Sequence, residues 1–88
     1  MAQPPPRIIW SHEAFARFQE LPFATRQEIL RKIEFIKVNP QMYQLEPEGR
    51  WAGLRRFVVQ SWVVFYGYWQ VENTAYVEAI VAARSDRR

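Results

Sequence analysis

The stretch from Gly53 to Tyr66, in which a nearly unbroken run of β-branched and aromatic residues follows two arginines, constrains the fold of this chain most strongly. Such residues suit a pleated, half-buried surface, so the run predicts strands. It is too short and too interrupted to span a membrane, which takes about 20 apolar residues. Arg55 and Arg56 stand at its start. We therefore expect the central hairpin of a β-sheet, with a basic pair at its entrance.

Two helices are expected before this run. Ser11 is the expected N-cap of the first helix, which should stop at Leu21 because the residue before a proline disfavours α geometry. The second helix is expected to begin with a capping box, in which the Thr25 hydroxyl caps a backbone amide and Glu28 reaches back. It should end at Asn39, directly before another proline. The short turn between the two helices predicts an αα-hairpin.

The remaining segments predict a sheet. A first strand is expected at residues 7–10, and three more follow the helices at about 54–60, 62–69 and 74–83. Residues 40–53, rich in proline, glycine and charge, are expected to be a connection. The order strand, helix, helix and three strands favours an α+β fold, with one antiparallel sheet covered on one side by the helical hairpin.

The length of 88 residues suits a single domain spanning residues 1–88. Within it, residues 1–6 are expected to form a proline-rich leader and residues 84–88 a basic tail. A hydrophobic content of 49% argues against disorder. The absence of cysteine excludes disulfides, thiolate nucleophiles and cysteine-ligated metals, and it fits the cytoplasm, where we expect the protein. No signal peptide is recognised at the start.

Basic residues gather in two places. The net charge of +3 permits a nucleic-acid, ribosomal or acidic-protein partner. Residues 50–61 contain arginines and no acid, whereas residues 13–48 mix both signs like ordinary helix surfaces. The candidate residues for binding a target or a nucleic acid are Arg50, Arg55, Arg56, Arg84, Arg87 and Arg88.

Several of these features, taken in order, resemble the RelE/ParE superfamily of bacterial type II toxins, which includes plasmid stabilisation proteins. The resemblance covers about residues 7–88. It rests on the short first strand, on a helix containing Glu13-Ala14 and Phe18, and on Leu21-Pro22, Arg26, Asn39-Pro40, Gly53-Leu54-Arg55-Arg56, the run Trp62-Val63-Val64-Phe65-Tyr66, and Arg84.

The resemblance implies a small cytoplasmic toxin that inhibits growth and is neutralised by an acidic antitoxin encoded beside it. RelE-like members cleave mRNA in the ribosomal A site, whereas ParE-like members bind DNA gyrase and are not nucleases. We expect the antitoxin to bind either by strand addition at an edge of the sheet or in an apolar groove of the helices. No cofactor, metal ion or membrane is implied.

At two positions this sequence departs from the pattern of RelE-like toxins, and these positions help to distinguish the RelE-like from the ParE-like branch. RelE-like sequences tend to carry arginine directly after the aromatic residue of the middle strand, where Val63 follows Trp62 here. RelE-like nucleases often place tyrosine or histidine after the final arginine, and no ring follows Arg84. Both departures favour a ParE-like protein that inhibits gyrase by binding. The alternatives are a ribosome-dependent mRNA endonuclease using Arg55, Arg56 and Arg84, and a non-toxic basic interaction domain.

Ordinary structural roles compete with these functional ones. Arg55 and Arg56 are adjacent on a strand and must point to opposite faces, and the sequence does not select the outward one. Arg84 could form a terminal salt bridge. The aromatic residues Trp62, Tyr66 and Tyr68 are favoured as core or sheet cover over stacking on a base. His12, the single histidine, is expected to be a surface or capping residue and not a catalytic base. Whether the chain is an enzyme stays open.

Overall fold

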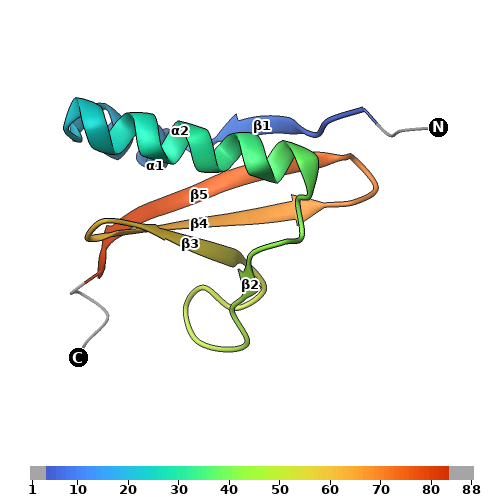
Figure 1. Cartoon of the computed structure of the whole chain (residues 1–88). Helices are drawn as coiled ribbons and strands as arrows, with labels where there is room; N and C mark the ends of the chain where they lie inside the picture. The colour runs from blue at the N-terminus through green and yellow to red at the C-terminus, as the bar shows by residue number, and fades with distance from the viewer. Residues whose placement is uncertain (1–3, 84–88) are drawn as a thin grey trace.

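A computed structural model describes residues 4–83 of the chain (Figure 1). Strand β1 is followed by two helices and then by four more strands. The three long strands confirm the predicted segments at 54–60, 62–69 and 74–83, whereas β2 lies inside the predicted connection. The bounds are β1 Arg7–Trp10, α1 His12–Glu20, α2 Phe23–Val38, β2 Gln44–Leu45, β3 Arg55–Val59, β4 Trp62–Trp69 and β5 Thr74–Ala82.

The five strands form one sheet in the order β1-β5-β4-β3-β2. The hairpin of β3 and β4 therefore contains the central strand, as the apolar run predicts. The α+β fold is confirmed, with one difference from the expected antiparallel sheet. Strand β1 pairs with β5 in parallel, so the sheet is mixed. This pairing joins opposite ends of the chain, and no local signal in the sequence specifies its direction.

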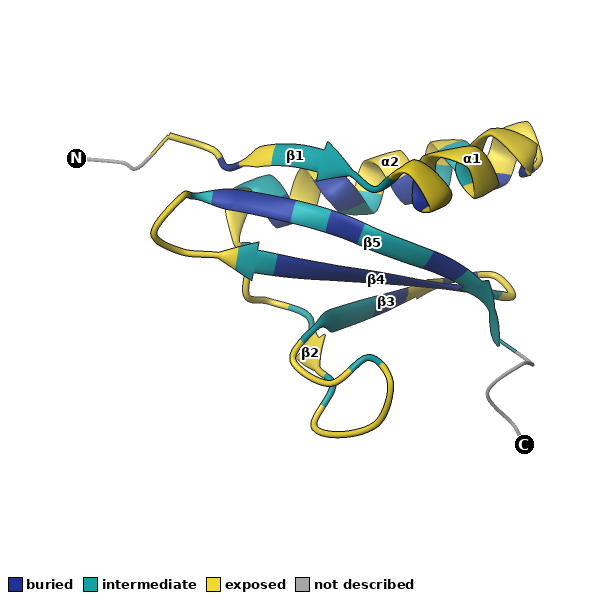
Figure 2. Ribbon diagram, turned by 180° about the vertical axis from the view of Figure 1, so that it is seen from behind, coloured by how far each residue is buried: buried dark blue, intermediate teal, exposed yellow. Residues whose placement is uncertain are grey.

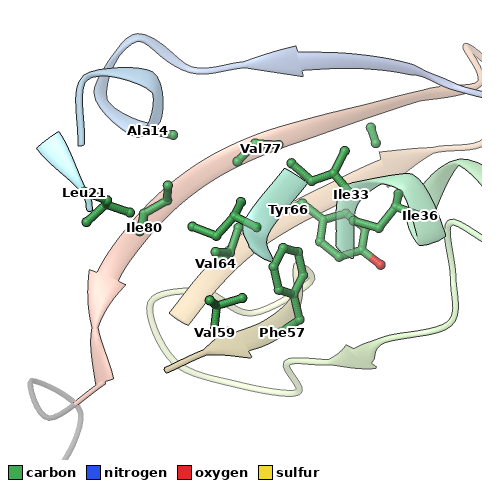
Figure 3. Close-up of a cluster of buried hydrophobic side chains, with 12 residues drawn as sticks. Ala14, Leu21, Ile33, Ile36, Phe57, Val59, Val64, Tyr66, Val77 and Ile80 are labelled. Carbon is green, nitrogen blue, oxygen red and sulfur yellow. The ribbon is translucent and has the colours of Figure 1, made fainter. Parts of the chain in front are cut away.

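Both helices lie on one face of the sheet (Figures 1 and 2). The core between the two layers is built from alternate residues of the strands and from the inward stripes of the helices (Figure 3). Each fully buried aliphatic or aromatic side chain contributes about 1.5–3 kcal/mol. The buried cluster comprises Ala14, Leu21, Ile29, Ile33, Ile36, Phe57, Val59, Val64, Tyr66, Ala75, Val77 and Ile80.

The beginnings of the two helices differ from each other. Ser11 caps α1 as predicted, because its hydroxyl accepts a hydrogen bond from the backbone of Ala14 at 3.0 Å. The predicted capping box of α2 is wrong. The N-cap is Pro22, and the Thr25 hydroxyl, inside the helix and buried, donates to the Gln60 side chain at 3.3 Å. Proline fixes a backbone angle suited to the start of a helix, so α2 begins earlier than the threonine.

Tyr66 connects the central strand to the segment that follows α2. Its side chain is 0% exposed, and its hydroxyl donates a hydrogen bond to the Pro40 carbonyl at 2.9 Å. Burial raises the pKa of Tyr66 to about 12, although the nearby Arg55 guanidinium acts in the opposite direction. This partly buried hydrogen bond anchors the chain between α2 and β2.

Candidate functional site

The arginines at the start of β3 point to opposite faces of the sheet, and the structure determines which is which. Phe57 and Val59 share the strand parity of Arg55 and are buried under the helices. Val58 shares the parity of Arg56 and is 49% exposed. Arg56 therefore belongs to the face turned away from the helices, which we call the open face.

Arg55 is engaged within the fold. Its Nη1 donates a hydrogen bond to the Tyr43 carbonyl at 2.8 Å, and it lies opposite Tyr66 in the register of β3 and β4. A charged donor of this kind holds the segment before β2 against the sheet. This position is on the helix-covered side, apart from the other candidate arginines that the structure describes.

Arg56 pairs with a carboxylate that the sequence did not single out. Its Nε lies 3.1 Å from Oε2 of Glu46, and the two side chains are 36% and 20% exposed. Glu46 directly follows β2, which pairs with β3 in antiparallel fashion. The short second strand is therefore what places the carboxylate beside the arginine.

The loop from Glu46 to Gly53 folds over the open face. The Trp51 ring stacks on the Phe65 ring with centroids 4.6 Å apart and an interplanar angle of 16°, and the Arg50 guanidinium lies 4.7 Å from the Trp51 centroid. The base of the loop is closed by two backbone hydrogen bonds, from Glu46 to Leu54 and from Gly53 to Glu46. Trp51 thus covers Phe65, which is only 2% exposed although it points away from the helices.

A groove of about 820 Å³ runs between this loop and the end of β5. It brings together the predicted Arg50 and Arg56 with residues that the sequence did not suggest. We call it the open-face groove. Its lining residues are Arg17, Glu46, Glu48, Gly49, Arg50, Trp51, Arg56, Phe65, Val81 and Ala82.

Val63 lies on the same face as Phe65 because the two residues alternate with Val64 along β4. It is opposite Val58 on one side and Val81 on the other. These neighbours make the middle of the open face apolar. The groove is lined by arginines and glutamates, and no histidine or tyrosine lines it among residues 4–83.

The other predicted site residues fall elsewhere. Arg84, Arg87 and Arg88 lie outside the described residues, although Ala82, close to them in sequence, lines the groove. His12 is exposed at the start of α1. The predicted core role of the strand aromatics is confirmed, because Tyr66 belongs to the core and both Trp62 and Tyr68 pack against it.

Sequence reasoning missed Arg17, Glu46 and Trp51 because each reaches the groove through tertiary structure. Arg17 lies on α1, where its guanidinium is 5.4 Å from the centroid of the Trp62 ring. The pairing of β2 with β3, which places Glu46, involves only the two exposed residues Gln44 and Leu45 on the β2 side. Trp51 would have been the easiest to find, since a tryptophan between two glycines in a polar loop suggests a covering role.

No cluster of three or more histidine, cysteine, aspartate or glutamate side chains among residues 4–83 could hold a metal ion. Neither described helix has the length and apolar character needed to cross a membrane.

Comparisons with solved structures identify proteins that share this fold. A chain of the intact E. coli RelBE toxin-antitoxin complex superposes with a TM-score of 0.76 and 12% identity, covering 89% of this chain and 96% of that chain. A chain of the archaeal RelE-RelB complex from Pyrococcus horikoshii OT3 gives a TM-score of 0.77 and 16% identity, covering 96% and 99%. Isolated E. coli RelE gives 0.78 and 10% identity, covering 89% and 84%.

Sequence comparisons give a more specific result. A search of curated proteins found no match. The model of the family described as the ParE toxin of the type II toxin-antitoxin system, parDE, matches residues 8–88. That span contains both helices, strands β2 to β5, all of β1 except its first residue, and the residues of the open-face groove. The chain therefore belongs to the ParE toxin family of type II toxin-antitoxin systems.

Proposed function

We propose that this chain is a ParE-like toxin that inhibits DNA gyrase by binding to it in the cytoplasm. The observation that carries the proposal is the chemistry of the open face. Val58, Val63 and Val81 occupy its middle, where Val58 is 49% exposed and Val63 is buried, and Arg56, the cation that β3 directs to this face, is paired with Glu46. An apolar surface bordered by polar groups is typical of protein recognition.

Cleavage of RNA through the 2′-hydroxyl makes different demands on a site. A base must activate the hydroxyl, a cation must stabilise the added phosphate charge, and an acid must protonate the leaving oxygen. An apolar strand centre supplies none of these groups. The match to the ParE family model supports the same branch.

We also propose that the partner in the resting cell is a cognate antitoxin. The structures with the same fold include toxin-antitoxin complexes, namely E. coli RelBE and the archaeal RelE-RelB pair. The basic surface of this chain, with a net charge of +3, suits an acidic partner.

One observation favours an mRNA endonuclease as the second candidate. Glu46 and Arg56 bring a carboxylate and a guanidinium to 3.1 Å in one groove, and Arg50 lines the same groove. A carboxylate can act as a base and arginines can stabilise phosphate charge. Arg84 would be the further cation of such a site.

Two assays on the purified chain separate the candidates. The first measures supercoiling of relaxed plasmid by gyrase, and the second maps mRNA 5′ ends in a translating extract. We expect inhibition of supercoiling and an unchanged set of mRNA ends. Codon-phased cuts that disappear in an Arg84→Ala variant would refute the proposal in favour of the endonuclease. If the chain neither inhibits supercoiling nor cuts mRNA, and cells grow normally on induced expression, the chain is a non-toxic interaction domain.

Variants locate the binding surface. Arg56→Ala removes a cation of the groove, and truncating a charged interface contact costs at least about tenfold in affinity. Arg31→Ala is the matched control, because Arg31 also forms one ion pair, with Glu28 at 2.8 Å, but lies on α2. We expect the first variant to inhibit gyrase at least about tenfold less well and the second to match the wild type. Equal inhibition by both variants would show that the open-face groove is not the surface that binds gyrase.

A further inference from the structure

Trp69 lies on the half of the open face that is remote from the open-face groove. Strand β4 pairs Trp62 with Ala82, which lines the groove, and pairs Trp69 with Thr74 at the opposite end. Trp69 shares the strand parity of Phe65 and therefore belongs to the open face. It is 45% exposed, whereas Phe65, which stacks under the loop, is 2% exposed. This half of the open face thus presents an aromatic side chain to solvent.

Three neighbours hold the Trp69 ring in position. A Cβ added to Gly67 would collide with Cζ3 of Trp69 and would lie 2.8 Å from Cη2, so the six-membered ring occupies the space over that glycine. The same Cβ would lie 2.9 Å from Cδ2 of Leu54, which borders this space. On the β5 side, the Tyr76 ring meets the indole edge to face, with centroids 5.2 Å apart and an interplanar angle of 82°. A ring that is fixed in advance loses little side-chain entropy when it binds a ligand.

Carboxylates lie next to this pair of rings. Oε1 of Glu72 accepts a hydrogen bond from the Tyr76 hydroxyl at 2.8 Å. This hydrogen bond raises the pKa of Tyr76, as do burial and the negative charges of Glu72 and Glu78, whereas Arg7 acts in the opposite direction. Neither glutamate forms an ion pair within residues 4–83. This end of the open face therefore carries two unneutralised carboxylates in a chain whose net charge is +3.

Two other tryptophans of the chain show which group such a ring attracts. The Arg50 guanidinium lies 4.7 Å from the centroid of Trp51, and the Arg17 guanidinium lies 5.4 Å from the centroid of Trp62. The face of an indole ring attracts cations, most often arginine. No arginine or lysine among residues 4–83 lies over the Trp69 ring. Trp69 thus combines an exposed ring and a neighbouring carboxylate with no cation from the described part of the chain.

We propose that Trp69 and Glu72 form a binding site for an arginine side chain of a protein partner. The guanidinium packs on the exposed part of the indole and donates hydrogen bonds to the carboxylate. Tyr76 contacts both groups and so places them at one site. Arginine suits the site better than lysine, because its planar group stacks on an aromatic ring and also donates to a carboxylate. The inference goes beyond the proposed action on gyrase and does not depend on it.

The test uses the full chain and a capped eight-residue peptide of alternating arginine and alanine. NMR follows the indole N–H of Trp69 and the backbone amides of Gly67 and Tyr76 as peptide is added. We expect saturable shifts of these three groups, with half-saturation below about 10 mM. The same peptide with glutamate in place of arginine should leave them unshifted, and the lysine peptide should bind at least about twofold more weakly.

Two variants test the two parts of the site. Trp69→Leu keeps an apolar side chain over Gly67 but removes the aromatic ring, and binding is then followed at the Tyr76 amide. Glu72→Gln removes the negative charge but keeps an oxygen that accepts the Tyr76 hydroxyl. We expect each variant to give a dispersed spectrum and to bind the arginine peptide at least about threefold more weakly.

Matched controls come from α2. Phe23 is an aromatic residue that is 67% exposed, and the Glu34 side chain is a carboxylate that is 66% exposed. Phe23→Leu and Glu34→Gln make the same kinds of change away from the site, so both should bind the arginine peptide as the wild type does.

Four results would overturn the proposal. The first is the absence of saturable shifts at Trp69 with the arginine peptide, and the second is unchanged binding by a folded Trp69→Leu or Glu72→Gln variant. The third is a shift of the Trp69 indole by single-stranded oligothymidylate at lower concentrations than by the arginine peptide, which would identify a base as the ligand. The fourth is a shift that follows protein concentration without peptide, which would identify a second copy of the chain.

Discussion

Replacing Tyr66 by phenylalanine tests how the core anchors the segment after α2. The change removes the hydroxyl that donates to the Pro40 carbonyl at 2.9 Å and leaves the buried ring in place. A neutral hydrogen bond contributes about 0.5–1.5 kcal/mol, so we expect the free energy of unfolding at pH 7 to fall by about 1 kcal/mol.

The same variant has a distinctive pH dependence. Burial raises the pKa of Tyr66 from 10.0 to about 12, so between these values the unfolded chain has lost the proton that the native chain keeps. Stability then falls as pH rises, by about 1.4 kcal/mol per unit, or roughly 2–3 kcal/mol over the window. Tyr66→Phe lacks this loss, so the two stability curves should cross near pH 11.

Urea unfolding followed by tryptophan fluorescence at several pH values measures both effects. Tyr68→Phe is the control, because it also loses a hydroxyl bond, to Asn73 at 2.8 Å, but retains Tyr66 and therefore the alkaline loss. Parallel stability curves for wild type and Tyr66→Phe between pH 10 and pH 12 would refute the reasoning.

Further variants test the two faces of β3 and the loop over the open face. Arg55→Ala should lower the free energy of unfolding by about 1.5–3 kcal/mol, because a charged hydrogen bond to the Tyr43 carbonyl is lost. Gyrase inhibition by the folded variant should be unchanged. A loss of inhibition without a loss of stability would place Arg55 in the binding surface. Trp51→Ala should uncover Phe65 and lower stability by roughly 1–3 kcal/mol through lost stacking and burial, measured by urea unfolding. A decrease below about 0.5 kcal/mol would mean that the stack holds the loop only weakly.

The sequence predicted what local patterns determine. Long runs of β-branched and aromatic residues correctly predicted β3, β4 and β5. The rule that the residue before a proline disfavours α geometry correctly predicted the end of α1 before Pro22. The start of α2 was predicted wrongly, because two signals disagreed. The sequence from Thr25 to Glu28 fits a capping box, whereas Pro22 favours a helix that begins at Phe23. In the structure Pro22 is the N-cap, and the buried Thr25 hydroxyl donates a hydrogen bond to the Gln60 side chain.

Features that depend on contacts between distant parts of the chain could not be predicted from the sequence. The parallel position of β1 pairs the beginning of the chain with its last strand. The outward direction of Arg56 follows from which neighbours the helices cover, and alternation along the strand alone could not determine it. Glu46 reached the open-face groove only through the pairing of a two-residue strand, which leaves almost no trace in a single sequence.

Gyrase supercoiling in the presence of the purified chain tests the central claim most directly. Increasing amounts of the chain should abolish the conversion of relaxed to supercoiled plasmid, and the folded Arg56→Ala variant should require at least about tenfold more protein. Full supercoiling at a large molar excess of the folded chain, together with codon-phased mRNA cuts in a translating extract, would contradict the account.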